Sequence, residues 1–313
     1  MSKKPVLSLC IPTNGITKWV LPVVNSIYHG IDEYSKFEVI ITDNGNNTDF
    51  ENVMKGLSKK YLNLRYYKTN AHMFMNQIEA FKLAEGQFIK FVNHRIALLP
   101  GTVDYLILFA ERNLESKPVT YFSNGVLKLP QKVYECNSFD GYVRLLSFWS
   151  SWSAGTAMWK SDFESLNFDE KFNRMFPHTN LIFSNKNANK YIIDNKPIMK
   201  EIKTDMTLKG EYDLFGAFAV EYPRIIEDLY LNNYISKSTY DCVIRENGKF
   251  LNKLYFDYVI RGVPCSYDLS GLEKTIGIYY SKQEICGERL NNYIRHYFNL
   301  MKNYIYNILN HYV

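Results

Sequence analysis

The sequence predicts an α/β fold in which helices flank an open, mostly parallel sheet. Two short and nearly continuous apolar runs, residues 6–12 and 37–42, have the pattern of strands buried on both faces. Residues 18–28 between them place apolar side chains at helical spacing. A strand, a helix and a strand in this order form a right-handed parallel βαβ unit. With 313 residues and a hydrophobic fraction of 46%, the chain can bury a large core around such a sheet.

The same alternation continues along the chain. The next expected helices are residues 49–60, 74–84 and 103–114, and the next expected strands are residues 62–67, 86–92 and 119–122. Residues 139–159 are rich in Ser, Trp and Gly, which favours loops with one short strand. Beyond about residue 213 Gly and Pro become rare and helical patterns dominate. We therefore expect an α/β domain over residues 1–210, with ligands at the carboxyl ends of its strands, and a mostly helical region over residues 211–313.

The composition excludes several classes of protein. A net charge of +5 suits acidic ligands or an anionic membrane surface, but it is too small for a nucleic-acid-binding chain. The five cysteines show no C-x-x-C spacing, which argues against a zinc site or a disulfide framework and favours the cytoplasm. The first apolar run is too short for a secretory signal, and no stretch of about 18 apolar residues could span a membrane. Aromatic residues reach 16%, so we expect some rings to line a binding cleft.

Three segments, in order and at the usual separations, resemble family 2 glycosyltransferases, which have the GT-A fold. They are Ile11-Pro12-Thr13-Asn14, Glu38-Val39-Ile40-Ile41-Thr42-Asp43-Asn44-Gly45, and a run from Asn76 through Gly86 to Pro100-Gly101. Each segment alone is a weak signal, because an apolar run that ends in Pro or Asp-Asn-Gly is a common turn. The resemblance implies a Rossmann-like mixed sheet with a nucleotide-sugar donor cleft. It places Pro12, Thr13, Asn76 and Asn93 in that cleft and implies that Asp43 accepts a hydrogen bond from the nucleotide base.

The third segment departs from the family where its members carry metal-binding aspartates. The family pattern is F-L-D-x-D-D, but this chain has Asn93-His94-Arg95 in that place. A guanidinium offers planar, permanently charged donors to phosphate oxygens, so we expect Arg95, with His94 beside it, to hold the donor diphosphate without a metal. Asn93 alone is a poor ligand for a hard cation, and we expect no metal cofactor. Two alternatives stay open: Mn²⁺ or Mg²⁺ bound with help from Asp43, and Arg95 as a surface residue in a donor site that has decayed.

Two later segments resemble the acceptor half of the same family. Gly155-Thr156-Ala157-Met158-Trp159-Lys160 is similar to the strand under the acceptor site, and Phe168-Asp169-Glu170 is similar to an F-D-E motif. The family then carries an aspartate that deprotonates the acceptor hydroxyl, whereas this chain has Pro177-His178-Thr179-Asn180-Leu181. A neutral imidazole can take that proton, so His178 is the candidate base. In the alternative, His178 is a hydrogen-bond donor in the cleft wall and Asp169 is the base.

Residues 290–313 place apolar side chains along one helical stripe, with Lys, Arg, Asn and His over much of the remainder. Such a helix packs on its own domain or on a second subunit, or it lies on the inner face of the cell membrane.

Together these patterns predict a cytoplasmic glycosyltransferase that moves a sugar from a nucleotide-diphosphate donor to a glycan or lipid-linked acceptor. Bacterial surface polysaccharide synthesis and inversion at the anomeric carbon are implied by the resemblance alone. The alternative is a catalytically inactive glycosyltransferase-like binding or scaffold subunit.

Overall fold

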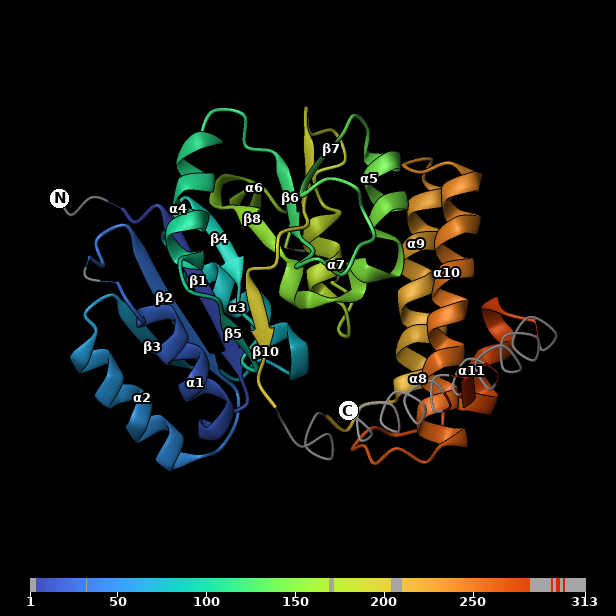
Figure 1. Cartoon of the computed structure of the whole chain (residues 1–313), viewed down its shortest axis with the longest axis horizontal. Coiled ribbons are helices and arrows are strands. Elements are labelled where there is room, and N and C mark those ends of the chain that lie inside the picture. The colour runs from blue at the N-terminus through green and yellow to red at the C-terminus, as the bar shows by residue number, and fades with distance from the viewer. Residues whose placement is uncertain are drawn as a thin grey trace, which may run out of the picture. The chain divides into compact units, whose positions relative to one another are not determined.

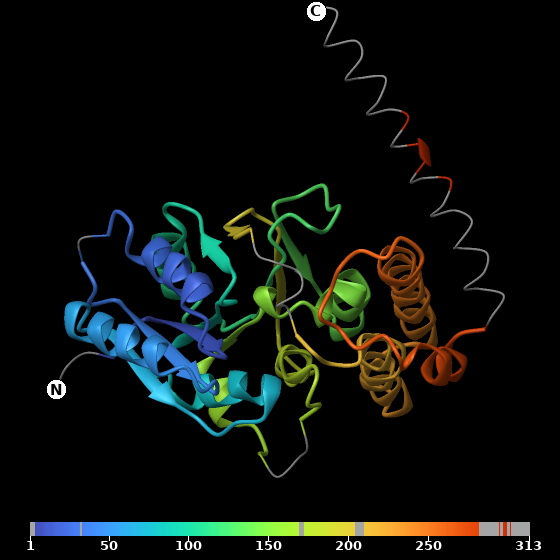
Figure 2. The same ribbon diagram turned by 90° about the horizontal axis from the view of Figure 1, so that it is seen from below.

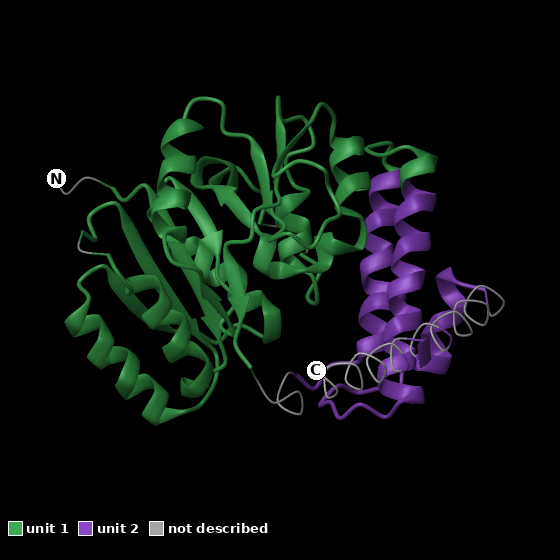
Figure 3. Ribbon diagram, viewed as in Figure 1, with its two compact units in different colours: residues 1–204, 232–239 green, residues 205–231, 240–313 purple. Residues whose placement is uncertain are grey.

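The computed structural model describes residues 4–31, 33–168, 172–203 and 210–281, together with Ile294, Tyr297, Phe298 and Met301. The chain forms two compact units. The first contains Met1–Thr204 and Asn232–Thr239, and the second contains Asp205–Leu231 and Tyr240–Val313 (Figure 3). The first division along the chain therefore falls after Thr204, and a short later segment returns to the first unit.

A five-stranded mixed sheet is the centre of the first unit (Figure 1). Its order is β3-β2-β1-β4-β8, with bounds β1 (Leu7–Thr13), β2 (Phe37–Asp43), β3 (Leu64–Lys68), β4 (Phe88–Phe91) and β8 (Ala157–Trp159). The first four strands are parallel and β8 is antiparallel to β4. This arrangement confirms the expected α/β class. Because β1, β2 and β4 are parallel neighbours, the segments that follow them emerge at one edge of the sheet.

Helices cover both faces of this sheet, because alternate strand residues point to opposite sides. On one side Leu9 and Ile11 pack with side chains of α1 (Thr17–Tyr28), α2 (Thr48–Lys60) and α4 (Thr102–Arg112). On the other side Cys10 packs with side chains of α3 (Asn76–Leu83), α6 (Lys160–Glu164) and α7 (Pro177–Ile182). Figures 1 and 2 show α1 and α3 on these opposite faces.

Two smaller sheets complete the first unit. One has the order β6-β9-β7, with bounds β6 (Val119–Phe122), β9 (Tyr191–Asp194) and β7 (Val133–Cys136), and the other pairs β5 (Ile96–Leu98) with β10 (Met199–Glu201). The expectation of loops and one strand over residues 139–159 was wrong in part. The segment begins with helix α5 (Phe139–Leu146), followed by the 3₁₀ turns η2 (Ser147–Ser151) and η3 (Ser153–Gly155) and then β8. Ser138 caps α5 by accepting from Gly141 N at 3.1 Å, and the helix buries Phe139, Tyr142, Val143 and Leu146, which recur at helical spacing.

The second unit is helical in its described residues. Its elements are α-helices and two π-helical turns, in the order α8 (Leu214–Gly216), π-turn η5 (Ala217–Glu221), α9 (Tyr222–Leu231), most of α10 (Lys237–Tyr255), π-turn η6 (Phe256–Ile260) and α11 (Leu272–Tyr279). The buried side chain of Asn247 donates to Phe218 O at 2.7 Å and contacts the Tyr280 hydroxyl at 2.6 Å, which joins α10 to η5 and to the residue that follows α11. Over the part of the chain that the structure describes, no helix is both long and apolar enough to cross a bilayer.

Candidate functional site

The side chain of Asn76 links the carboxyl ends of β1 and β2 by hydrogen bonds to both strands. Its side chain is 2% exposed, and its Nδ2 donates to Thr13 O at 3.1 Å and to Thr42 O at 2.9 Å. Its Oδ1 accepts from the Thr69 hydroxyl at 2.8 Å. Both amide hydrogens are therefore used on the backbone, so in this structure Asn76 shapes the edge of the sheet. Direct contact of Asn76 with a donor stays a prediction.

Asp43, the last residue of β2, is fully buried. Its Oδ1 accepts from Gly45 N at 2.8 Å, and its Oδ2 accepts from the Tyr66 hydroxyl at 2.8 Å and from Lys68 Nζ at 3.1 Å. A Cβ on Gly45 would lie 2.0 Å from Asn14 O, so the turn after β2 requires glycine. The carboxylate thus holds this turn and β3 together, while each oxygen can accept more than one hydrogen bond. Its contact with a nucleotide base stays a prediction.

The segment Asn93-His94-Arg95, which is expected to correspond to the metal-binding aspartates of family 2 glycosyltransferases, forms a tight turn directly after β4. Asn93 Oδ1 accepts from Arg95 N at 3.0 Å, and Asn93 O accepts from Ile96 N at 2.9 Å. This is the geometry of an Asx turn, which short amide side chains favour. Asn93 therefore shapes the loop that presents the two residues after it.

Trp19, His94 and Arg95 form a cluster beside this turn. The Arg95 guanidinium carbon lies 5.1 Å from the centre of the Trp19 ring, and the His94 ring lies 5.3 Å from it. Trp19 is a buried residue of α1, so its ring is a fixed support for the guanidinium. Burial, with a smaller contribution from the Arg95 charge, lowers the pKa of His94 to about 3. The imidazole is therefore neutral near pH 7, and Arg95 carries the positive charge.

Thr13 connects the cluster to β1. Its Oγ1 accepts from Gly15 N at 3.2 Å and lies 2.9 Å from His94 Nδ1. We infer that the Thr13 hydroxyl donates to Nδ1, since this gives the hydroxyl hydrogen an acceptor. Nε2 of His94 then carries the ring hydrogen and is a hydrogen-bond donor. Pro12 pairs opposite Thr42 in the same strand register and places Thr13 at the edge.

His178, the candidate base, lies at the start of α7 and is 4% exposed. Its Nε2 donates to Ser151 O at 2.8 Å, because a carbonyl can only accept. Its Nδ1 is buried and has no hydrogen-bond partner among the described residues, so it is the basic atom of the ring. Burial lowers the pKa of His178 to about 4. Asp169, the alternative base, lies outside the described residues.

Buried, uncharged histidine makes stability depend on pH. The unfolded pKa of histidine is about 6.5, so the unfolded chain binds more protons than the folded one between pH 6.5 and about 4. The folded chain therefore has its full stability with respect to this histidine above pH 6.5, and it loses stability as the pH falls from 6.5 toward 4. We expect the free energy of unfolding, measured with urea, to fall across it. The fall should be shallower in His178→Gln, whose amide can still donate to Ser151 O but does not titrate; an unchanged slope would contradict the assignment.

The sequence did not single out two residues that shape this region. Trp19 was seen only as part of an apolar helix pattern, and nothing local marks it as a support for Arg95. Lys90 had a visible signal, since it interrupts a strand that is otherwise apolar and buried on both faces. The structure buries Lys90 with 1% exposure, under the loop that leads into β8.

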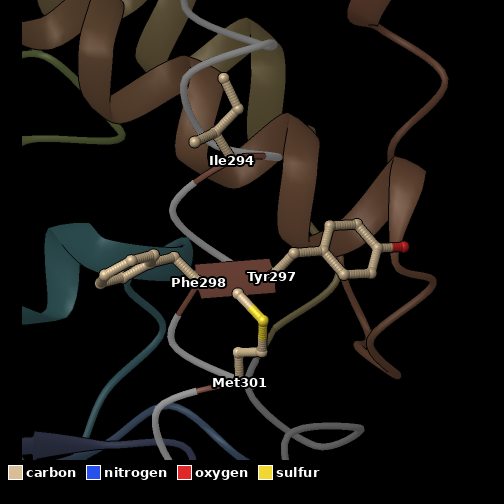
Figure 4. Close-up of a pocket in the computed structure, with 4 residues that line it drawn as sticks. All are labelled: Ile294, Tyr297, Phe298 and Met301. Atoms are coloured by element: carbon tan, nitrogen blue, oxygen red, sulfur yellow. The ribbon is translucent and has the colours of Figure 1, made fainter.

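Within residues 4–31, 33–168, 172–203 and 210–281, no group of three His, Cys, Asp or Glu side chains could hold a metal ion. The expectation of a metal-free site stays a prediction. Of the expected helix over residues 290–313, only four residues are described. Ile294, Tyr297, Phe298 and Met301 are helical, more than half exposed, and line a shallow apolar recess of about 430 Å³ (Figure 4). Their contact with a membrane or a subunit stays a prediction.

No protein-family model matches the chain, and no curated protein matches it. Its structure is similar to solved structures of S. aureus TarS. Compared with TarS 1-349 in complex with UDP-GlcNAc, the TM-score is 0.56 with 16% sequence identity, over 92% of this chain and 89% of that chain. Compared with TarS 1-349 in complex with UDP, the TM-score is 0.52 with 15% identity, over 86% and 77%. The chain therefore has the fold of a GT-A-type glycosyltransferase.

Proposed function

We propose that the chain is a glycosyltransferase that moves a sugar from a nucleotide-diphosphate donor to a glycan or lipid-linked acceptor. The similar structures of TarS with UDP-GlcNAc and with UDP support a UDP-sugar donor. Membership of family 2, inversion, a cytoplasmic or membrane-surface location and a role in bacterial surface polysaccharide synthesis rest on the sequence resemblance. The proposal is carried by one observation, the Arg95 guanidinium supported by Trp19 where family members carry carboxylates.

This cluster suits a departing diphosphate. When the sugar–phosphate bond breaks, negative charge grows on the leaving group, and fixed donors in a partly buried site stabilise it. Arg95 supplies a charge that does not titrate, and its stacking on Trp19 limits the conformations that it must give up on binding. His94 is neutral and adds an N–H donor without repelling Arg95.

The acceptor side of the proposal assigns His178 as the base. Its Nε2 is occupied by Ser151 O, so the proton from the acceptor hydroxyl would go to Nδ1. Proton transfer to the ring, attack on the anomeric carbon and departure of the diphosphate toward Arg95 complete one displacement. A pKa of about 4 keeps the ring unprotonated throughout the neutral pH range.

Arg95→Ala is expected to weaken UDP binding by about 10- to 100-fold, because a hydrogen bond to a charged group contributes about 1.5–3 kcal/mol. Calorimetric titration with UDP in the presence of EDTA measures this effect and the metal requirement together. Arg95→Lys should restore only part of the affinity, since an ammonium has neither the planar fork nor the stacking. Arg112→Ala, which removes the same charge from the exposed end of α4, is the matched control.

Two results would contradict the proposal in different ways. Loss of UDP binding by the wild-type protein in EDTA would show that a metal holds the diphosphate. Absence of binding to UDP, GDP and CDP with or without Mn²⁺ would favour the inactive scaffold, an alternative that agrees with the protein partners already bound by Asp43 and Asn76.

A further inference from the structure

A short loop between α5 and β8 carries a cluster of aromatic side chains. Phe148, Trp149 and Trp152 are each partly exposed. The rings of Phe148 and Trp149 are stacked with centroids 5.0 Å apart, and the Trp149 and Trp152 rings are 6.4 Å apart at 78°. The cluster therefore offers apolar rings in two nearly perpendicular orientations.

Buried side chains hold the backbone of this loop at four successive carbonyls. The Tyr121 hydroxyl donates to Trp149 O at 2.6 Å and also contacts Trp152 O at 2.9 Å. The two carbonyls between Trp149 and Trp152 are also hydrogen-bonded. The Thr179 hydroxyl donates to Ser150 O at 3.0 Å, and His178 Nε2 donates to Ser151 O at 2.8 Å. Loop carbonyls are ordinarily satisfied by solvent, so this degree of fixation is more than a connection needs. A backbone held in this way presents its side chains in one arrangement.

Lys90 extends this fixation to the end of the loop. Its ammonium donates to Phe91 O at 2.7 Å, to Ala154 O, and to Thr156 O at 3.3 Å, so each of its three hydrogens has a carbonyl acceptor. Among the described residues no carboxylate pairs with it, and burial alone lowers its pKa to about 7. A buried cation without a counter-ion is costly, which indicates a role that an apolar side chain would not fill.

The loop adjoins the same edge of the sheet as the Arg95 cluster. Phe91, the last residue of β4, donates its N–H to Thr156 O at 3.1 Å, and Lys90 lies opposite Ala157 in the β4–β8 register. Two residues beyond Phe91 the chain enters the turn that presents Arg95. The carboxyl end of β4 is thus bounded by the charged cluster and by the end of the aromatic loop.

We propose that Trp149 and Trp152, with Phe148 stacked on Trp149, form a saccharide-binding surface for a pyranose ring of the acceptor, and that Lys90 is its positioning residue. A pyranose has an apolar face of C–H groups that stacks on aromatic rings, while its hydroxyl groups stay in water or bind polar groups at the rim. This assignment rests on the proposed function, because it places an acceptor sugar beside the site where the donor diphosphate would bind.

Saturation-transfer NMR with methyl pyranosides tests the surface directly. The probes are both anomers of methyl glucoside, galactoside, mannoside, N-acetylglucosaminide and N-acetylgalactosaminide. We expect transfer to the ring C–H protons of at least one probe, and an affinity about ten-fold lower in Trp149→Leu and in Trp152→Leu, since an aromatic contact contributes about 1–1.5 kcal/mol. Tyr234→Leu, which removes a ring that is 45% exposed elsewhere in the unit, should bind as the wild type does. No transfer to any probe, or undiminished transfer in both tryptophan variants, overturns the proposal.

A second comparison tests the positioning role of Lys90. Lys90→Met keeps the length of the side chain and removes its three donors, and we expect it to lose saccharide binding while its affinity for UDP stays within about two-fold of the wild type. Lys90→Arg restores donors and should recover part of the saccharide binding. Unchanged saccharide binding in folded Lys90→Met overturns the role.

The UDP titrations separate the two levels of inference. Saccharide binding without UDP binding would leave the surface standing and remove the proposed transferase function. UDP binding without saccharide binding would remove the saccharide-binding surface and leave the proposed transferase function standing.

Discussion

Replacing His178 with alanine is expected to lower the rate of sugar transfer by about 10²–10⁴-fold, the usual effect of removing a general base. The unpartnered Nδ1 of His178 is the atom that would take the proton, and because burial lowers the pKa of the ring it is neutral near pH 7. UDP affinity should change little, because the residues assigned to the diphosphate belong to other elements. The measurement is UDP release from UDP-sugars with a bacterial envelope glycan preparation as acceptor, beside a UDP titration of the same variant.

His178→Gln distinguishes a base from a side chain that only holds the loop. A glutamine amide can donate to Ser151 O, as Nε2 does, but it cannot take a proton at neutral pH. If His178 is the base, glutamine should be as inactive as alanine. Recovery of turnover in His178→Gln would show that His178 acts only by its hydrogen bond to Ser151 O. Asp169 would then be the candidate base.

Gly155→Ala is expected to destabilise the first unit by about 3 kcal/mol or more, at the upper end of what overpacking costs. A Cβ at this position would lie 2.2 Å from Cζ and 2.5 Å from Cε2 of Tyr121, whose ring is fully buried. The ring cannot retreat without breaking the hydrogen bond from its hydroxyl to Trp149 O and the contact of the hydroxyl with Trp152 O. Urea unfolding followed by circular dichroism gives the free energy of unfolding.

Gly56→Ala is the matched control for this prediction. Gly56 lies in α2, and a Cβ there would meet nothing within 4 Å. The same substitution should therefore stabilise the protein slightly, by up to about 1 kcal/mol, because alanine favours a helix. Equal stability of Gly155→Ala and the wild type would mean that the contact between Gly155 and Tyr121 is looser than the structure has it.

The fold could be predicted because its signals are local. The apolar runs that became β1, β2 and β4 and the spacing of α1 and α2 are each contained in a few neighbouring residues. Helix α5 was missed although Phe139, Tyr142, Val143 and Leu146 recur at helical spacing, because the Ser, Trp and Gly residues after them favoured a loop over the whole segment.

The candidate site was predicted only in part, since its geometry depends on contacts between distant residues. The contact of Asn76 with Thr13 joins positions 63 apart in the sequence, and that of His178 with Ser151 joins positions 27 apart. Nothing near Arg95 in the sequence shows that Trp19 supports it. The sequence could name the unusual residues at Asn93, His94 and Arg95, but only the folded chain shows that the first makes a turn and the other two form a cluster.

Because the positive charge of Arg95 is part of the protein, it would also affect the rate at which UDP leaves after sugar transfer. A metal ion can depart together with a spent nucleotide, whereas a guanidinium supported by Trp19 remains in place and keeps its attraction for the product. Dissociation of UDP would then be the slow step, and it would quicken as added salt screens the charge. Such an enzyme would work faster at moderate ionic strength than in dilute buffer.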